Sequence, residues 1–333
     1  MKKRQLSQGF ITDLLPGGCL NPLLKEVQED DTLCLELRGN FGDSCRGEAV
    51  NIYYRGGSLY KIVKDTNKYV ITCEKANSWC ESYRVKLPID LISVSNAVDK
   101  IAFFKDAIDK SGKITLEKEF QQLIERVNNG VVKNSKKSFE KIKKISNSTD
   151  YYIVDTEYVG NNEESGFRFD MVGLKWKSNN MIRRKLKNAT LALMEVKYGD
   201  GALNGSSGIK KHLMDFEMFL NNQSLLREFY LDVLEVFKQK CELGLITGLE
   251  EYQWNQNDKV DAIDTEILFV FANHNPNSKI LMNELNSKDV QNVLQRINKI
   301  APNSVKVAIA SVMGYGLYID KIIDVNSFIK ELN

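Results

Sequence analysis

The chain has 333 residues, 43% of them hydrophobic, so it can bury one large core or two smaller ones. Its 46 basic and 44 acidic residues give a net charge of +2, which excludes a globally basic surface and restricts nucleic-acid contact to local patches. No stretch approaches the ~20 apolar residues of a membrane helix, and the six cysteines form no CxxC pair. We therefore expect a cytoplasmic protein with reduced thiols, no membrane contact and no zinc site.

Residues 1–94 are predicted to form a small strand-rich N-terminal domain. Apolar and polar residues alternate in four segments, and this period predicts strands at residues 32–38, 49–55, 59–63 and 68–73. Gly56 with Gly57, and the segment 65–67, separate three of these strands and are typical of turns. We therefore expect an antiparallel meander of four strands.

The pattern then becomes helical. Ser95 can cap a helix over residues 97–110, because its hydroxyl can accept a hydrogen bond from the first turn. Thr115 can cap a second helix, which carries Glu119 on its surface. The lysine-rich run 133–144 follows, and it is equally consistent with a solvated helix surface and with contact to a phosphate backbone.

Three further strands are predicted at residues 151–157, 166–174 and 191–198. In the second of them Phe169 and Asp170 point to opposite faces, and in the third Glu195 and Lys197 share a face. A polar connector separates the second strand from the third and favours a hairpin. Two neighbouring strands would bring Asp170, Glu195 and Lys197 together at one end of a sheet.

The segment Glu195-Val196-Lys197 is the only acidic-x-lysine triplet in the sequence, and it follows an apolar run typical of a buried strand. Carboxylates from Asp170 and Glu195 suit Mg²⁺ or Mn²⁺, and the Lys197 ammonium can orient a water molecule beside them. The alternative is that the triplet is an ordinary solvated strand face. Glu157 is a further candidate ligand, although it can equally pair with an arginine on the next strand.

A polar, glycine-rich loop over residues 199–208 is long enough to cover a cleft, and one of the two serines near its end can cap the next helix. Lys210, Lys211 and His212 fall in the first turn of that helix. Cations at this position oppose the helix dipole, so helix stability does not explain why they are there. Anion binding is the explanation that this position favours.

A basic cluster occupies the connector between the strands of Asp170 and Glu195, and its members are Arg183, Arg184, Lys185 and Lys187. Its position beside the proposed site favours contact with a phosphate backbone. Downstream, the pattern predicts helices at 224–242, 287–299 and 325–332 and strands at 266–272 and 305–311. His274 lies just past the first of these two strands.

Asp170 together with Glu195-Val196-Lys197 resembles the motif of the PD-(D/E)XK nuclease superfamily, which has a restriction-endonuclease-like fold. The resemblance implies that Asp170, Glu195 and the Val196 carbonyl bind Mg²⁺, while Lys197 positions the attacking water. Glu119 lies on a helix before the first core strand, where many members carry an acidic residue, and is implied to hold a metal-bound water. No proline precedes Asp170, which departs from the family pattern.

The expected fold class is α/β (α+β), with a mixed-sheet restriction-endonuclease-like core flanked by helices at 95–333, preceded by the strand-rich domain at 1–94. The resemblance implies a Mg²⁺- or Mn²⁺-dependent endonuclease that cleaves phosphodiester bonds, in DNA more than in RNA. It also implies a role in restriction or anti-phage defence, with a homodimer or a defence complex as the assembly. One alternative is a catalytically silent nuclease-like scaffold that binds nucleic acid or a partner protein. Another is an interaction protein whose N-terminal sheet recruits a further subunit.

Overall fold

The computed structural model describes residues 3–39, 47–65, 68–73, 94–112, 114–130, 149–161, 166–178, 189–249, 264–275, 277–310 and 316–332. They form two compact units. Unit 1 contains Ser146–Leu231 and Tyr252–Asn333 together with Met1, and unit 2 contains Lys2–Ile145 and Asp232–Glu251. No helix within the described ranges is long and apolar enough to cross a membrane.

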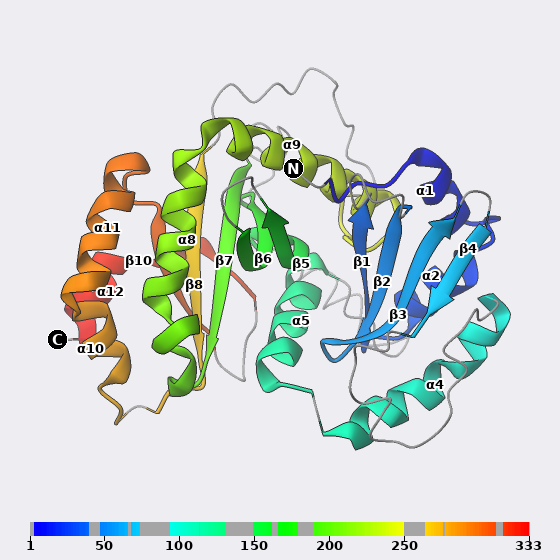
Figure 1. Cartoon of the computed structure of the whole chain (residues 1–333), viewed down its shortest axis with the longest axis horizontal. Coiled ribbons are helices and arrows are strands. Elements are labelled where there is room, and N and C mark those ends of the chain that lie inside the picture. Colours follow the sequence, from blue (N-terminus) through cyan, green and yellow to red (C-terminus); the bar gives the residue numbers. More distant parts are fainter. Residues whose placement is uncertain are drawn as a thin grey trace. The chain divides into compact units, whose positions relative to one another are not determined.

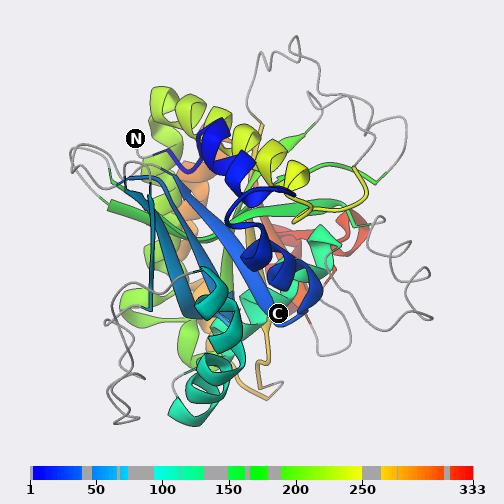
Figure 2. The same ribbon diagram turned by 90° about the vertical axis from the view of Figure 1, so that its right-hand side faces the viewer.

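Unit 2 contains a four-stranded antiparallel sheet in the order β1-β2-β3-β4, visible as neighbouring blue strands in Figures 1 and 2. Its strands are β1 (Leu33–Gly39), β2 (Ala49–Tyr54), β3 (Gly57–Asp65) and β4 (Lys68–Thr72). The predicted meander is therefore confirmed. The β2–β3 turn lies at Arg55 and Gly56, whose positive φ angles of 49° and 76° match a tight hairpin. Gly56 is also required sterically, because a Cβ atom there would lie 2.7 Å from the backbone of Lys118.

Among the described residues, the helices of unit 2 are α1 (Gln8–Leu14), α2 (Asn21–Glu29), α4 (Val94–Ser111) and α5 (Leu116–Asn129), and the C-terminal part of α9 (Gln223–Glu242) also belongs to this unit. The Thr115 cap is confirmed, since its side chain accepts a hydrogen bond from the Lys118 amide. α1 and α2 were missed by the strand-rich interpretation of the first segment. Their signals are a Ser7 cap on α1 and a proline, Pro22, in the first turn of α2.

A buried ion cluster joins β1, α5 and α9 inside unit 2. The Lys240 ammonium, which is 0% exposed, lies 2.9 Å from Glu36 Oε1 and 2.9 Å from Glu125 Oε1. Burial disfavours the charged lysine, but the Glu125 and Glu36 carboxylates outweigh it and raise the pKa of Lys240 above its ordinary value. Lys240 therefore remains a cation that both carboxylates share.

Unit 1 contains a six-stranded mixed sheet in the order β10-β9-β8-β7-β6-β5. Its strands are β5 (Tyr151–Asn161), β6 (Gly166–Lys175), β7 (Thr190–Tyr198), β8 (Thr265–Ala272), β9 (Val305–Ala310) and β10 (Ile323–Asp324). β5, β6 and β7 pair antiparallel as hairpins, whereas β7, β8 and β9 pair parallel through helical crossovers. β7 is thus an inner strand with a neighbour on each side, and the expected α/β architecture of two sheets is confirmed.

Within the described ranges, the helices of unit 1 are α8 (Ile209–Asn221), the N-terminal part of α9, α10 (Ile280–Asn286), α11 (Lys288–Ile300) and α12 (Val325–Leu332). α8 packs against β6 and against α11, and Figure 1 shows it running alongside β7 and β8. Phe169 of β6 stacks on Phe216 of α8 with ring centroids 5.3 Å apart, and Phe219 contacts the same ring at 5.2 Å. These aromatic contacts fix α8 against the sheet.

The predicted domain boundary between residues 94 and 95 stays a prediction, because the two units are defined by packing alone. α4 and α5, which the sequence interpretation assigned to the nuclease-like domain, lie in the unit that contains the N-terminal sheet. The C-terminal part of α9 belongs to that unit as well.

Candidate active site

The acidic-x-lysine triplet lies on β7, an inner strand that pairs antiparallel with β6 and parallel with β8. Glu195 is only 1% exposed and Lys197 only 2%. The interpretation of this triplet as a solvated strand face is therefore wrong. Ionised groups are rarely buried to this extent unless they are paired, so the geometry of their partners decides what the cluster can do.

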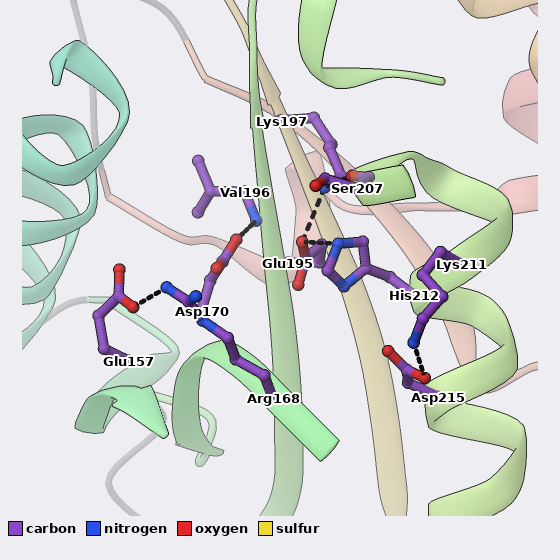
Figure 3. Close-up of polar contacts among 10 residues, drawn as sticks. All are labelled: Glu157, Arg168, Asp170, Glu195, Val196, Lys197, Ser207, Lys211, His212 and Asp215. Atoms are coloured by element: carbon purple, nitrogen blue, oxygen red, sulfur yellow. Dashed lines mark hydrogen bonds and ion pairs between the residues drawn. The ribbon is translucent and has the colours of Figure 1, made fainter. Parts of the chain in front are cut away.

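Glu195 and Lys197 point together toward the N-terminal end of α8, as Figure 3 shows. The Lys197 ammonium donates to Glu195 Oε1 at 2.7 Å and to the Ser207 carbonyl at 2.8 Å. His212 Nε2 lies 2.9 Å from the same Glu195 oxygen. Burial first, and then the charge of Lys197, lower the pKa of His212 to about 4. His212 is thus a neutral imidazole at pH 7 that donates its Nε2–H to Glu195.

Asp170 occupies the point where β6 leaves β7. The ladder between these strands ends at the pair Met171 and Met194, and beyond it the Val196 amide donates to Asp170 Oδ2 at 2.9 Å. A side-chain carboxylate thus takes the place of a backbone acceptor, as Figure 3 shows beside Val196. Burial first, and then the Glu195 carboxylate, raise the pKa of Asp170 to about 7.

The structure therefore brings Asp170, Glu195 and Lys197 into one buried cluster of interacting charges. Glu195 hydrogen-bonds to the lysine, whereas Asp170 hydrogen-bonds to a backbone amide. The attraction of Lys197 and the Val196 hydrogen bond do not cancel the effects of burial and of the second carboxylate on Asp170. A divalent cation between the carboxylates would relieve this repulsion.

The donor atoms at this point suit a hard cation. In an extended strand the N–H and C=O of one residue point toward the same neighbouring strand, so the Val196 carbonyl faces the side on which Asp170 lies. Two carboxylates and a carbonyl are all oxygen donors, as Mg²⁺ prefers. Among the described residues no group of three or more histidine, cysteine, aspartate or glutamate side chains could hold a metal ion. A site with two carboxylates completed by water and phosphate oxygens is the usual arrangement for Mg²⁺.

Glu157 occupies the register position opposite Asp170, between the pairs Thr156–Met171 and Tyr158–Phe169. Its φ of 55° is unusual for a non-glycine residue inside a strand. Its carboxylate pairs with the Arg168 guanidinium (Figure 3), which is the alternative left open by the sequence. Its negative charge also contributes, as the least of the named causes, to the raised pKa of Asp170.

Glu119 lies on α5 in unit 2, where it is held by an arginine. Arg55 Nε donates to Glu119 Oε1 at 2.7 Å, and the same guanidinium contacts Asp109 at 2.7 Å. The Glu119 carboxylate is therefore engaged within its own unit. Its role with a metal-bound water stays a prediction.

The predicted nucleic-acid contacts divide into two groups. Arg183, Arg184, Lys185 and Lys187 lie outside the described residues, as does the lysine-rich run 133–144. Lys210 and Lys211 are exposed on α8, and each is paired, Lys210 with Asp289 at 2.6 Å and Lys211 with Asp215. All six nucleic-acid contacts stay predictions.

The predicted serine cap of α8 is wrong. The N-cap residue is Gly208, which offers no side-chain hydrogen bond, and Ser207 lies in a short 3₁₀ turn before it. Ser207 contributes its carbonyl to Lys197 instead.

Sequence reasoning missed the contacts made by the two histidines. His212 contacts Glu195, and the ring of His274 lies 3.1 Å from the Lys197 carbonyl through Nε2. The chain contains only two histidines, and both contact the triplet. Their scarcity, and the position of His274 just past a predicted strand, were the available signals.

No family model, curated protein or solved structure matches this chain. The function must therefore be argued from the geometry of the site.

Proposed function

We propose that the chain is a divalent-metal-dependent nuclease of the PD-(D/E)XK type, which hydrolyses phosphodiester bonds in DNA more than in RNA. The observation that carries the proposal is the pair of buried carboxylates, Asp170 and Glu195, of which Asp170 has a pKa raised to about 7. A buried ionised pair under repulsion is costly to the fold and is typical of a functional site. A six-stranded sheet that joins an antiparallel hairpin to parallel strands supports a restriction-endonuclease-like core.

Asp170, Glu195 and the Val196 carbonyl are the groups that would hold the metal. When bound, Mg²⁺ or Mn²⁺ lowers the pKa of a coordinated water and acts as a Lewis acid on the phosphoryl oxygen. The donors fit this role because they are hard oxygens and because a dication would offset the charge that now raises the pKa of Asp170.

Lys197 supplies the second catalytic element. A lysine ammonium has three N–H donors, and within the described residues two of them are directed to Glu195 and Ser207. The third donor can orient the attacking water, or it can stabilise negative charge that develops on the phosphate oxygens. Because both fixed partners are themselves buried or backbone groups, the ammonium is held in place before substrate arrives.

His212 orients Glu195 without adding charge. Its neutral ring donates Nε2–H to Glu195 Oε1, which leaves the repulsion between the carboxylates in place when no metal is bound. A protonated histidine there would instead compete with the metal for the carboxylate.

The test is a cleavage assay on single- and double-stranded DNA and RNA with Mg²⁺, with Mn²⁺ and with EDTA. Glu195→Gln and Lys197→Met should each lower the rate at least ~10²-fold, the scale of single electrostatic groups in active sites. Glu217→Gln is the matched control, because Glu217 lies on α8 in a partly exposed ion pair with Arg296. Cleavage that persists unchanged in EDTA would contradict the proposal.

One observation favours a second candidate, a catalytically silent scaffold that binds nucleic acid or a partner protein. Glu195 is already hydrogen-bonded by Lys197 and His212, so part of the cluster is satisfied by protein groups alone. Calorimetric titration separates the candidates, because the scaffold should bind neither Mg²⁺ nor Mn²⁺. A role in restriction or anti-phage defence, in a homodimer or a defence complex, rests on the resemblance alone.

A further inference from the structure

His274 lies beside the end of β7, and both of its ring nitrogens face oxygen atoms. Nε2 is 3.1 Å from the Lys197 carbonyl, and Nδ1 is 3.1 Å from Asp200 Oδ1. The ring makes a T-shaped contact with Phe271 of β8, with centroids 5.6 Å apart. The imidazole therefore bridges the backbone of Lys197 and the loop that follows it.

Both of these oxygens are hydrogen-bond acceptors. A carbonyl can only accept, and the pKa of Asp200 is held below its ordinary value, first by a Ser278 hydrogen bond and also by His274, so this carboxylate is ionised. Each ring nitrogen of His274 therefore faces a hydrogen-bond acceptor, one on the backbone of Lys197 and one on Asp200.

Asp200 in turn fixes the first turn of the 199–208 loop. The amide of Asn275 donates to the same Asp200 oxygen at 3.3 Å, and the Gly199 amide donates to the Ala272 carbonyl at 2.8 Å. The far end of the loop returns to the triplet, since the Ser207 carbonyl accepts from the Lys197 ammonium at 2.8 Å. The loop is therefore tied to Lys197 at both of its ends.

We propose that Asp200 and His274 act as a pair of positioning residues for Lys197 and for the 199–208 loop. This inference rests on the proposed function, in which the Lys197 ammonium acts on the attacking water or the phosphate. His274 fixes the backbone of Lys197, and the anchored loop supplies the Ser207 carbonyl that fixes its ammonium. Neither residue of the pair touches the substrate in this role. Displacement of a catalytic group by about 1 Å can cost ~10²-fold in rate, so distant anchors of this kind matter.

The test uses the full chain with two alanine variants, His274→Ala and Asp200→Ala. Each should lower kcat about 10- to 100-fold with KM little changed, because the ammonium is misplaced while the substrate surface is kept. Asp200→Asn should restore most of the kcat that Asp200→Ala loses, since its amide oxygen still accepts from Nδ1. Asn277→Ala is the matched control, because Asn277 is an exposed residue of the same connector and makes its hydrogen bond through its backbone amide.

A second readout does not depend on cleavage. Amide hydrogen exchange over residues 199–208 should speed up in both alanine variants and should stay at the wild-type rate in the control. A wild-type chain that cuts no nucleic acid would defeat the proposed nuclease, while exchange would still test the positioning pair. Unchanged exchange in both variants overturns the inference, and so does a rise in KM at unchanged kcat. Asp200 is the more exposed of the two residues at its side chain, so its variants keep the test valid if His274→Ala fails to fold.

Discussion

The same three charged groups, one lysine and two carboxylates, occur buried in both units. In unit 2 Lys240 lies between Glu36 and Glu125 and is 2.9 Å from each. In unit 1 Lys197 bonds to Glu195 and to the Ser207 carbonyl, while the other carboxylate, Asp170, bonds to a backbone amide. Lys240 is 0% exposed and Lys197 is 2% exposed, so burial does not distinguish the clusters. Arrangement does.

The difference in arrangement shows which pair of carboxylates shares one cation. Lys240 bonds to two carboxylates at once, and their combined charge raises its pKa. In unit 1 repulsion remains and raises the pKa of Asp170 to about 7. The shared cation braces unit 2 internally, whereas under the proposed function the repelling carboxylates of unit 1 receive an added cation.

The largest expected effects come from replacing each lysine by methionine. Lys240→Met should lower the free energy of unfolding by ~3–5 kcal/mol, because two carboxylates lose the ammonium that they share. Lys197→Met should instead lower the cleavage rate at least ~10²-fold. It should also tighten Mg²⁺ binding, because the ammonium no longer competes for Glu195. Denaturant unfolding, cleavage kinetics and calorimetry measure these three quantities.

Lys238→Met is the matched control for this pair, since Lys238 lies on α9 in a partly exposed ion pair with Glu235. It should change stability by no more than ~1 kcal/mol. If folded Lys240→Met protein cuts no nucleic acid while Lys197→Met protein retains full activity, the roles given to the two clusters are reversed.

A smaller effect is expected from Asp170→Asn, and its sign depends on pH. The pKa of Asp170 is about 7 in the folded chain against 3.8 for an ordinary aspartate, so the folded state binds the proton more tightly. Its contribution to stability is fully present below pH 3.8 and is lost as the pH rises toward 7. Between these two pH values the free energy of unfolding of the metal-free wild type should therefore fall by ~1 kcal/mol or more. The asparagine variant should not show this fall.

Unfolding in denaturant at several pH values, with EDTA present, checks this difference. Asp289→Asn gives the opposite sign, because the exposed Asp289 has a pKa lowered by its hydrogen bond with Lys210 and contributes stability that is lost on acidification. Equal pH dependence in wild type and Asp170→Asn would show that the carboxylates of unit 1 are as well satisfied as those of unit 2.

The contrast between the clusters also explains how much the sequence could predict. Glu195 and Lys197 are two residues apart on one strand, so the period of the strand alone places them together. The hairpin from β6 to β7 adds Asp170 by a short connection. Lys240 and Glu36 are separated by 204 positions, and no local pattern relates them. On an amphipathic helix a buried lysine has the same sequence signature as an exposed one.

The same limit applies to the fold and to the rest of the site. The strands of both sheets except the two-residue β10 were predicted, because alternation and apolar runs are local signals, whereas the strand order in the six-stranded sheet depends on crossovers. The His212 contact depends on how α8 packs on the sheet, and the His274 contact depends on the parallel pairing of β7 and β8. Tertiary packing decides both, so sequence periodicity could not reveal either.

The smallest expected effect extends the comparison from buried to exposed cations. Lys210 and Lys211 already pair with aspartates, as Lys240 does with its glutamates, so they offer less net charge to a phosphate backbone. Replacing both with methionine should flatten the slope of log K against log[salt] on duplex DNA by less than ~0.9 per residue.

Neutralising Arg183, Arg184, Lys185 and Lys187 together should flatten this slope by more, up to ~0.9 for each phosphate that no longer meets a cation. Binding titrations at several salt concentrations measure both slopes. A larger change from the lysine pair would mean that nucleic acid displaces the aspartates from these lysines. The α8 surface, rather than the β6–β7 connector, would then bind the phosphate backbone.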